Sequence, residues 1–293
     1  MHRMLPRAFA VLAWLVGLGV VAVVAGIVGF LAARGGALLG PKLLFGDAPA
    51  LDVLLGRQPA FHGLWAALAG TLVLVVGAAL IAVPLGVASG IYLAEYGGGR
   101  WGRAFGFAVD VLAGVPSIIM GLFGFGLILF LRRTLLPDAN TCLLLAMGCL
   151  ALLVLPYLVR TTESALRGLP ASIRLAGPSL GLSPWQTIWH VLLPAASRGI
   201  LSGVVLAVGR AAEDTAVIIL TGVVATAGLP GRLTDKFQAL PFTIYCLAAE
   251  HRDQGELNLA FGAALLLLSL TATLFLLASW LHHSLERRLG TRI

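Results

Sequence analysis

Residues 171–198 read ASIRLAGPSLGLSPWQTIWHVLLPAASR, and this stretch predicts two helices joined by a glycine turn. The tetrapeptide SPWQ at 183–186 is typical of a helix start, because serine caps, proline fits the first helical position and glutamine completes a capping box. Pro194 is predicted to end this helix, since the residue before a proline is pushed out of the α region. A shorter helix is expected over about 171–180, with the chain turning at Gly181.

The rest of the chain is too apolar for a protein surrounded by water. Apolar residues make up 59% of the 293 residues and charged residues 11%, whereas soluble proteins have about 45–50% and about 25%. The mean hydropathy is +0.97. This composition excludes a soluble enzyme, a disordered regulator and a nucleic-acid binder, although the net charge is +7. Basic residues between hydrophobic runs are typical of membrane proteins.

Six stretches are long enough to cross a membrane as helices, which needs about 20 apolar residues. They lie at about 8–33, 63–94, 105–131, 139–159, 199–222 and 257–281. The first is too long for the apolar region of a cleaved signal peptide and is expected to remain. The sequence therefore predicts an all-α integral membrane protein with one transmembrane domain over residues 1–293.

The basic residues predict the orientation of these spans. With the N-terminus in the cytoplasm, eleven of the 20 Lys and Arg residues lie in inside segments and eight in outside segments. Both termini and the loop 160–198 are then cytoplasmic, and the loops 34–62 and 223–256 are outside. We expect 223–256 not to form a seventh full span, because its start contains helix-breaking glycine and proline.

The long inside loop presents apolar residues at helical spacing, which favours docking onto a partner protein. These anchors are Leu175, Leu180, Trp185, Ile188, Trp189 and Leu192. The segment 171–181 is expected to lie crosswise to the spans. The same pattern is compatible with an amphipathic helix that binds only the lipid interface.

Three ionisable residues lie inside the fifth predicted span and are candidates for a functional site, because charges within a membrane are costly. Arg210, Glu213 and Asp214 are three and four residues apart, so they share one helix face. We predict that Arg210 pairs with Asp214 and also with Glu213, unless Glu213 turns away from the path. The alternative is an ion pair that only holds helices together. Two further carboxylates, Asp110 and Glu95, are read as residues of the membrane interface.

The sequence contains none of the motifs that would make this chain an enzyme. There is no Walker A motif, no HExxH and no GxSxG, and the three cysteines form no CxxC. We therefore expect no catalytic residue, no metal site and no cofactor bound by the chain itself.

The inside loop resembles the cytoplasmic EAA loop of ABC importer permeases, E-A-A-x3-G-x9-I-x-L-P. The positions of this pattern fall on Leu175, Ala176, Gly177, Gly181, Val191, Leu193 and Pro194. Leu175 and Gly177 depart from the Glu and the second Ala of the motif. The resemblance implies the type I importer fold, in which this helix-turn-helix loop couples the permease to a cytoplasmic ATPase that binds ATP and Mg²⁺.

Longer stretches are similar to one branch of these permeases, the phosphate importers of the PstA and PstC family. They are GTLVLVVGAALIAVPLGVASGIYLAEY (70–96), LAGVPSIIMGLFGFG (112–126), the loop 160–200 and GRAAEDTA (209–216). The stretch 239–251 is closer to the PstA type. In the family motif R-A-x-G-E-T, Arg210 matches the Arg, Asp214 takes the Glu position, Thr215 matches the Thr, and Glu213 replaces the Gly.

This resemblance implies a permease subunit that forms half of a phosphate pathway in the cell inner membrane. Its implied partners are a PstC-like permease, a PstB-like ATPase dimer, an extracytoplasmic PstS-like phosphate-binding protein and membrane lipid, with no nucleic acid. Two alternatives stay open. One is an ABC permease for another oxyanion, and the other is an ion-coupled secondary transporter that uses Glu213 and Asp214. A docking loop for an ATPase argues against the second.

Overall fold

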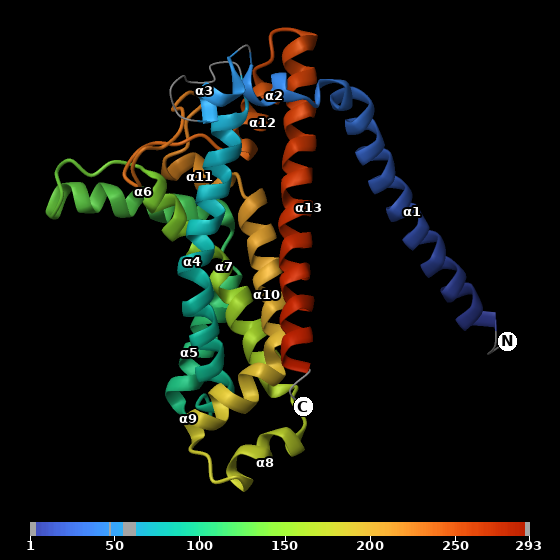
Figure 1. Cartoon of the computed structure of the whole chain (residues 1–293), viewed down its shortest axis with the longest axis vertical. Coiled ribbons are helices and arrows are strands. Elements are labelled where there is room, and N and C mark those ends of the chain that lie inside the picture. The colour runs from blue at the N-terminus through green and yellow to red at the C-terminus, as the bar shows by residue number, and fades with distance from the viewer. Residues whose placement is uncertain (1–3, 47, 55–62, 291–293) are drawn as a thin grey trace.

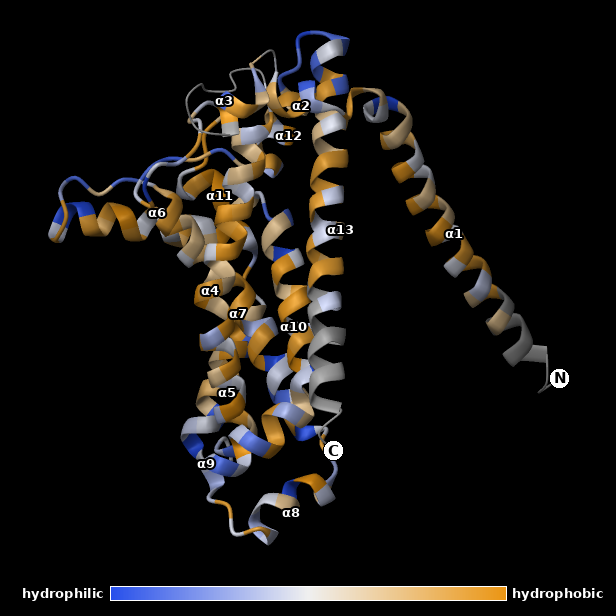
Figure 2. Ribbon diagram, viewed as in Figure 1, coloured by the Kyte–Doolittle hydropathy of each residue, from blue (hydrophilic) through white to orange (hydrophobic). Residues whose placement is uncertain are grey.

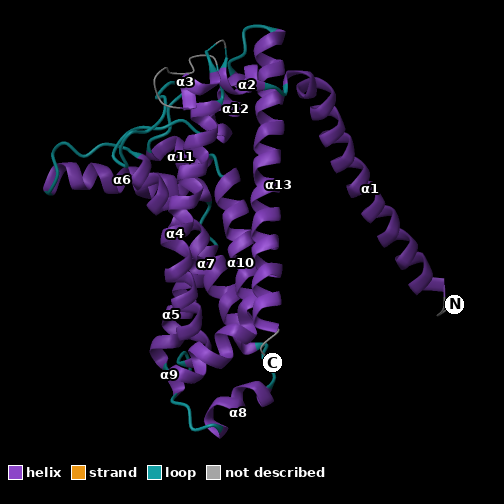
Figure 3. Ribbon diagram, in the orientation of Figure 1, coloured by secondary structure: helices purple, strands orange, loops and turns teal. Residues whose placement is uncertain are grey.

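The computed structural model describes residues 4–46, 48–54 and 63–290, and helices dominate this part of the chain (Figures 1 and 3). The helices are α1 (Met4–Gly35), α2 (Pro41–Phe45), α3 (Ala50–Leu54), α4 (Trp65–Glu95), α5 (Arg100–Ala113), α6 (Ser117–Thr134), α7 (Leu143–Arg167), α8 (Ala171–Ser179), α9 (Pro184–Thr187), α10 (Leu193–Glu213), α11 (Ala216–Thr221), α12 (Leu240–Ala249) and α13 (Gln254–Gly290). Among the described residues no strand forms, and the β pairing is one isolated bridge between Val223 and Phe237.

Four long helices, α4, α7, α10 and α13, run side by side and form the bundle (Figure 1). The core is richest around α7, where Leu150, Leu158 and Val159 are fully buried. Gly86 and Gly90 bring α4 close to α7. A Cβ at Gly86 would lie 2.5 Å from the Leu158 side chain, so only glycine allows this approach.

The prediction of six membrane-spanning helices is confirmed by length and composition. Six helical stretches of the described chain are long and apolar enough to cross a bilayer. Figure 2 shows apolar residues along the bundle helices and polar residues at its two ends. We call these ends the α8 end and the α2 end, after the short helix that lies at each.

The third predicted span, 105–131, is two helices rather than one. Helix α5 ends at Ala113 and α6 begins at Ser117. Pro116 is extended, with ψ 141°, and has no N–H to continue the helical ladder. After this break α6 projects sideways from the bundle (Figure 1).

The fifth predicted span, 199–222, is also broken. Helix α10 ends at Glu213, Asp214 is extended with ψ 114°, and the chain resumes as the six-residue helix α11. Gly222, with φ +143°, then ends α11 in a conformation that residues with a side chain rarely adopt.

The prediction that Pro194 ends the helix begun at Ser183 is wrong. Residues 188–192 form a π-helical turn, in which the Leu193 N–H reaches the carbonyl of Ile188, and α10 follows directly. The wider turn makes room for the proline ring and absorbs its missing N–H. The chain from Pro184 to Glu213 is therefore one continuous helical rod.

The segment 223–256 folds back over the α2 end and does not span the bundle. Its helix α12 has ten residues, about 15 Å, which is too short to cross a bilayer. The Leu143 and Leu144 N–H groups donate to the carbonyls of Asp235 and Leu233, at 3.0 and 2.8 Å. These bonds fasten the loop to the start of α7, so the prediction of no seventh span is confirmed.

Helix α1 diverges from the bundle and touches it mainly where it meets α13 (Figure 1). The apolar stretch of α1 is unburied within this chain. The N-terminal end of α1 and the C-terminal end of α13 both point toward the α8 end (Figure 1). The terminal residues themselves, 1–3 and 291–293, lie outside the described residues.

Candidate functional site

The predicted helix–turn–helix is present at the α8 end, where α8 lies across the direction of the bundle (Figure 1). We call residues 171–194 the docking segment. Gly181, with φ +74°, ends α8: its N–H donates to the Pro178 carbonyl at 3.0 Å, and the Leu182 N–H donates to the Gly177 carbonyl at 3.1 Å. These two bonds form a Schellman cap, whose left-handed residue favours glycine.

Helix α9 begins with the predicted capping box. The Gln186 N–H donates to the Ser183 hydroxyl at 3.3 Å, and the Ser183 N–H donates to the Gln186 side chain at 2.9 Å. Gly177 is buried against Thr187, and a Cβ there would collide with the threonine side chain. The glycine that replaces the second alanine of the motif therefore packs α8 against α9.

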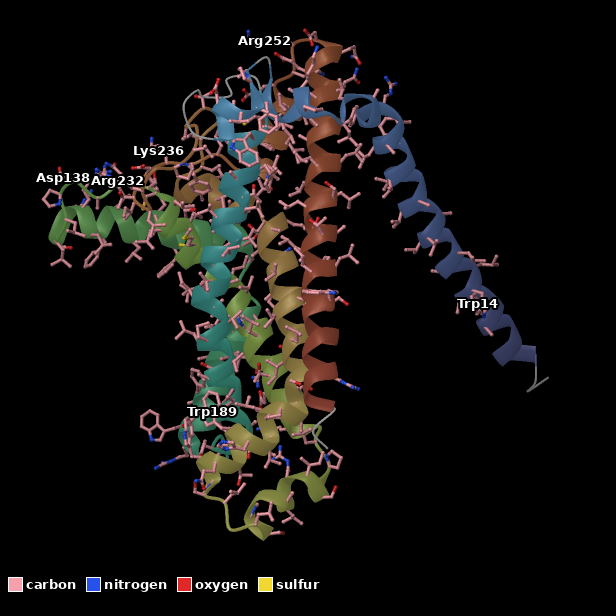
Figure 4. The ribbon with its side chains drawn as sticks, in the orientation of Figure 1. Trp14, Asp138, Trp189, Arg232, Lys236 and Arg252 are labelled. Atoms are coloured by element: carbon pink, nitrogen blue, oxygen red, sulfur yellow. The ribbon has the colours of Figure 1, made fainter. Side chains whose placement is uncertain are left out.

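Four of the six predicted anchors are exposed on the docking segment. Their exposed fractions are 63% for Leu175, 78% for Leu180, 61% for Trp185 and 52% for Trp189. The two tryptophan rings meet edge to face at 5.7 Å, and Trp189 lies at the α8 end of the molecule (Figure 4). The other two anchors, Ile188 and Leu192, instead pack into the bundle, because they lie on the opposite face of the helix.

Of the remaining predicted positions of this loop, two are exposed and two are partly buried. Ala176 and Pro194 are exposed, and Val191 and Leu193 are half-buried. The structure thus brings all seven motif positions into one compact segment, with Leu175 and Ala176 on its outer surface.

A set of ion pairs that the sequence did not predict lies beneath the docking segment. Arg174, on α8, binds the Glu95 carboxylate at the end of α4 with contacts of 2.9 and 3.2 Å. The same guanidinium donates to the Leu166 carbonyl on α7 at 2.5 Å. Glu95 therefore pairs with protein and is not simply an interface residue. Only the fold brings residues 79 positions apart into contact.

A second chain of ion pairs joins α5, α7 and α4. Arg160 binds Asp110 at 2.6 Å and Glu163 at 2.5 Å, and Glu163 binds Arg167 at 2.9 Å. Arg167 also donates to the Leu93 carbonyl at 3.0 Å. Glu163 is buried, so both arginines stabilise its charge. Asp110 on α5 thus pairs with Arg160 on α7 and is not simply a residue of the membrane interface.

The predicted path residues surround the break between α10 and α11. The Arg210 guanidinium lies 3.6 Å from Asp214, with 46% of the arginine side chain exposed and 3% of the aspartate. Asp214 also accepts a hydrogen bond from the Val217 N–H at 3.0 Å, which caps α11. Glu213 is exposed and forms no ion pair within the described chain, so the expected pairing with Arg210 is absent. Thr215 is half-buried at the break.

The two candidate sites are far apart and are joined by one element. The second half of the docking segment is the beginning of the helical rod, which starts at Pro184. The Arg210–Asp214 pair lies at the other end of the rod, about 40 Å from Pro184 at 1.5 Å per residue. No group of three His, Cys, Asp or Glu side chains able to hold a metal ion occurs in the part of the chain that the structure describes.

Comparisons with known proteins give this arrangement a context. The family described as "Binding-protein-dependent transport system inner membrane component" matches residues 82–291. The chain is 39% identical over 227 residues to "Phosphate transport system permease protein PstA 1" of Mycobacterium tuberculosis (strain ATCC 25618 / H37Rv), covering 77% of this chain and 71% of that one. It is 38% identical to the PstA protein of Haemophilus influenzae, covering 75% and 78% of the two chains.

Solved structures show a similar fold. The chain aligns with the inward-facing MetNI methionine ABC transporter at a TM-score of 0.57 and 20% identity, over 82% of this chain and 99% of that one. At this identity the likeness concerns the fold alone: the transporter's substrate says nothing about the substrate here.

Proposed function

Because this chain belongs to the family of binding-protein-dependent transport system inner membrane components, we propose that it is the permease subunit of an ATP-driven importer of inorganic phosphate. The substrate follows from the relatives at 38–39% identity, which are named as phosphate transport permeases. The chain forms half of the translocation pathway, and a second, PstC-like permease forms the other half.

The docking segment is the observation on which the proposal depends most. Four large apolar side chains stand exposed on a rigid, capped helical hairpin at one end of the bundle. Such a surface suits a protein groove, because burying it there removes apolar area from water. We assign this groove to a cytoplasmic ATPase dimer of the PstB type, which binds the ATP and Mg²⁺. The permease itself binds no cofactor and hydrolyses nothing.

The α2 end is then the outer face, where a phosphate-binding protein of the PstS type delivers its cargo. This orientation places the N- and C-termini and the docking segment in the cytoplasm. The protein crosses the inner membrane several times, and lipid covers the apolar outer faces of its helices.

The path residues in this proposal are Arg210, Asp214, Glu213 and Thr215. Asp214 is buried, and its carboxylate accepts a hydrogen bond from the start of α11 while it pairs with one side of the Arg210 guanidinium. The exposed part of the Arg210 guanidinium is free to face a passing anion, as expected for an anion pathway. Glu213 adds an exposed negative charge, so we expect a basic group of the second permease to lie against it.

The test is transport by the reconstituted complex with Arg210→Gln. We expect phosphate uptake to be lost while the subunits still co-purify, because the variant removes the charge and leaves a shorter polar side chain. Arg100→Gln removes an arginine at the α8 end that is exposed and should transport normally. Uptake by Arg210→Gln at the wild-type rate would show that Arg210 only holds the helices together. Competition by sulfate and molybdate at equal concentration separates phosphate from other oxyanions.

A further inference from the structure

We infer that the Arg174–Glu95 ion pair is the link through which the docking segment moves helix α4, and that it sets the coupling between ATP hydrolysis and transport. This inference rests on the proposed function, because it assumes that an ATPase binds the docking segment. Arg174 and Glu95 are positioning residues that touch neither substrate nor nucleotide.

The contacts of Arg174 place it between three helices. One of its terminal nitrogens, Nη1, donates to both oxygens of Glu95 at the end of α4, and the second, Nη2, donates to the Leu166 carbonyl near the end of α7. The side chains of Arg174 and Glu95 are 30% and 17% exposed, so water screens this pair less than a surface pair. A planar guanidinium is suited to such forked binding.

Arg174 also directly precedes the exposed surface of the docking segment. Its neighbour Leu175 is 63% exposed and faces the proposed ATPase. Helix α8 buries only Gly177 among its own residues, and that glycine packs on α9. Besides this packing on α9, α8 is attached to the bundle through Arg174 and through the half-buried Ile173, which packs beside Leu166.

Helix α4 is suited to carry a displacement from one end of the molecule to the other. It has 31 residues, about 46 Å, and packs along α7 for much of its length. At its α2 end, the Thr71 hydroxyl accepts a hydrogen bond at 2.8 Å from the N–H of Leu240, the first residue of α12. A movement of α8 that pulls on Glu95 is thus passed along α4 to α12. Pro84 removes one backbone hydrogen bond within α4, and the close packing of Gly86 on Leu158 supports the helix beside it.

The charges of the network favour a mechanical role over a ligand site. Three arginines pair with three carboxylates, so each of these charges already has a partner within the protein. They are Arg160, Arg167 and Arg174, against Glu95, Asp110 and Glu163.

The experiment measures ATP hydrolysis by the complete transporter in proteoliposomes, with and without phosphate-loaded binding protein. In R174Q and E95Q we expect the stimulation by loaded binding protein to fall about fivefold or more, a typical size for coupling between two sites. The charge swap E95R/R174E should recover much of the stimulation, because it restores the pair with its ends exchanged. R100Q, which removes an exposed arginine at the same end, should behave as wild type.

A second measurement keeps the inference testable if a single variant inserts poorly. In a background with Cys142, Cys149 and Cys246 replaced by alanine, E95C/R174C removes the pair, and a bismaleimide can rejoin the two positions. Joining them should restore stimulation. Normal stimulation in both single variants, or a crosslink that blocks transport, would overturn the inference. Failure of the wild-type chain to co-purify an ATPase would instead overturn the proposed function.

Discussion

At the scale of single residues, the structure of the docking segment depends on two glycines, each of which is required for a different physical reason. Gly181 is required for its backbone, since its φ of +74° is strained for other residues while the space around it is open. Gly177 has ordinary helical geometry and is required for space, because Thr187 occupies the place of a side chain.

Valine at either glycine should weaken binding of the ATPase, for different reasons. Gly177→Val pushes α8 away from α9 at a cost of about 1–3 kcal/mol. Gly181→Val strains the cap by about 1–2 kcal/mol. We expect less ATPase to co-purify with each, while insertion stays normal. Gly126→Ala, at a helical glycine with open space around it, is the matched control. Equal recovery of ATPase by all three variants would contradict this account.

Asp214 combines two roles that different substitutions separate. Asp214→Asn keeps an oxygen to accept from the Val217 N–H but removes the charge beside Arg210. Asp214→Ala removes both and should lower stability by about 1 kcal/mol more, the usual value of a helix cap. Thermal unfolding in detergent measures the difference. Identical midpoints for the two variants would show that the cap contributes nothing.

At the scale of elements, the rod from Pro184 to Glu213 joins the docking segment to the charged break. Its π turn at 188–192 sets the rotation of α9 relative to α10, because one extra residue in a turn shifts the helical register by about 100°. The direction in which Trp185 and Trp189 point therefore depends on this turn.

Pro194→Ala should change that direction. The new N–H can donate to the carbonyl of His190, so the π turn is free to relax to an α turn. We expect α9 to rotate and Trp189 to move out of the docking surface. The test uses W189C in the background without the three native cysteines. The rate at which this cysteine reacts with a thiol reagent is compared with Pro194 present and with Pro194 replaced by alanine. An unchanged rate would show that other contacts hold the π turn.

At the scale of the whole molecule, much apolar surface is left for lipid and a second subunit. Helix α1 diverges from the bundle and α6 projects sideways from it (Figure 1). Polar and charged residues gather instead along the loops of the α2 end. Asp138, Arg232 and Lys236 all lie on the outer side of α6 in Figure 4, and Arg252 lies at the tip of the molecule, whereas Trp14 lies on the outlying α1.

The proposed orientation, with the α2 end outside and the α8 end in the cytoplasm, predicts which positions an impermeant thiol reagent reaches. Thr234 and Leu180 are both exposed, at opposite ends of the bundle. In sealed cells without the native cysteines, T234C should react and L180C should not, whereas both should react in opened membranes. Labelling of L180C from outside would reverse the proposed orientation.

The sequence by itself determined the membrane class, the number of spanning helices, and the glycine turn and capped helix start of the docking segment. Those features follow from composition, from run length and from capping residues, which act within a few positions of one another. The SPWQ capping box and the turn at Gly181 are read directly from the chain and occur as expected.

Only the tertiary structure decided how helices break and which charges meet. The sequence could not show that a π turn carries the helix past Pro194, because the cost of a proline is offset by packing of Ile188 and Leu192 in the bundle. Nor could it pair Glu95 with Arg174, since ion pairs between residues 79 positions apart depend on how α4, α7 and α8 pack. Local rules fix where helices start, whereas long-range packing fixes what their side chains touch.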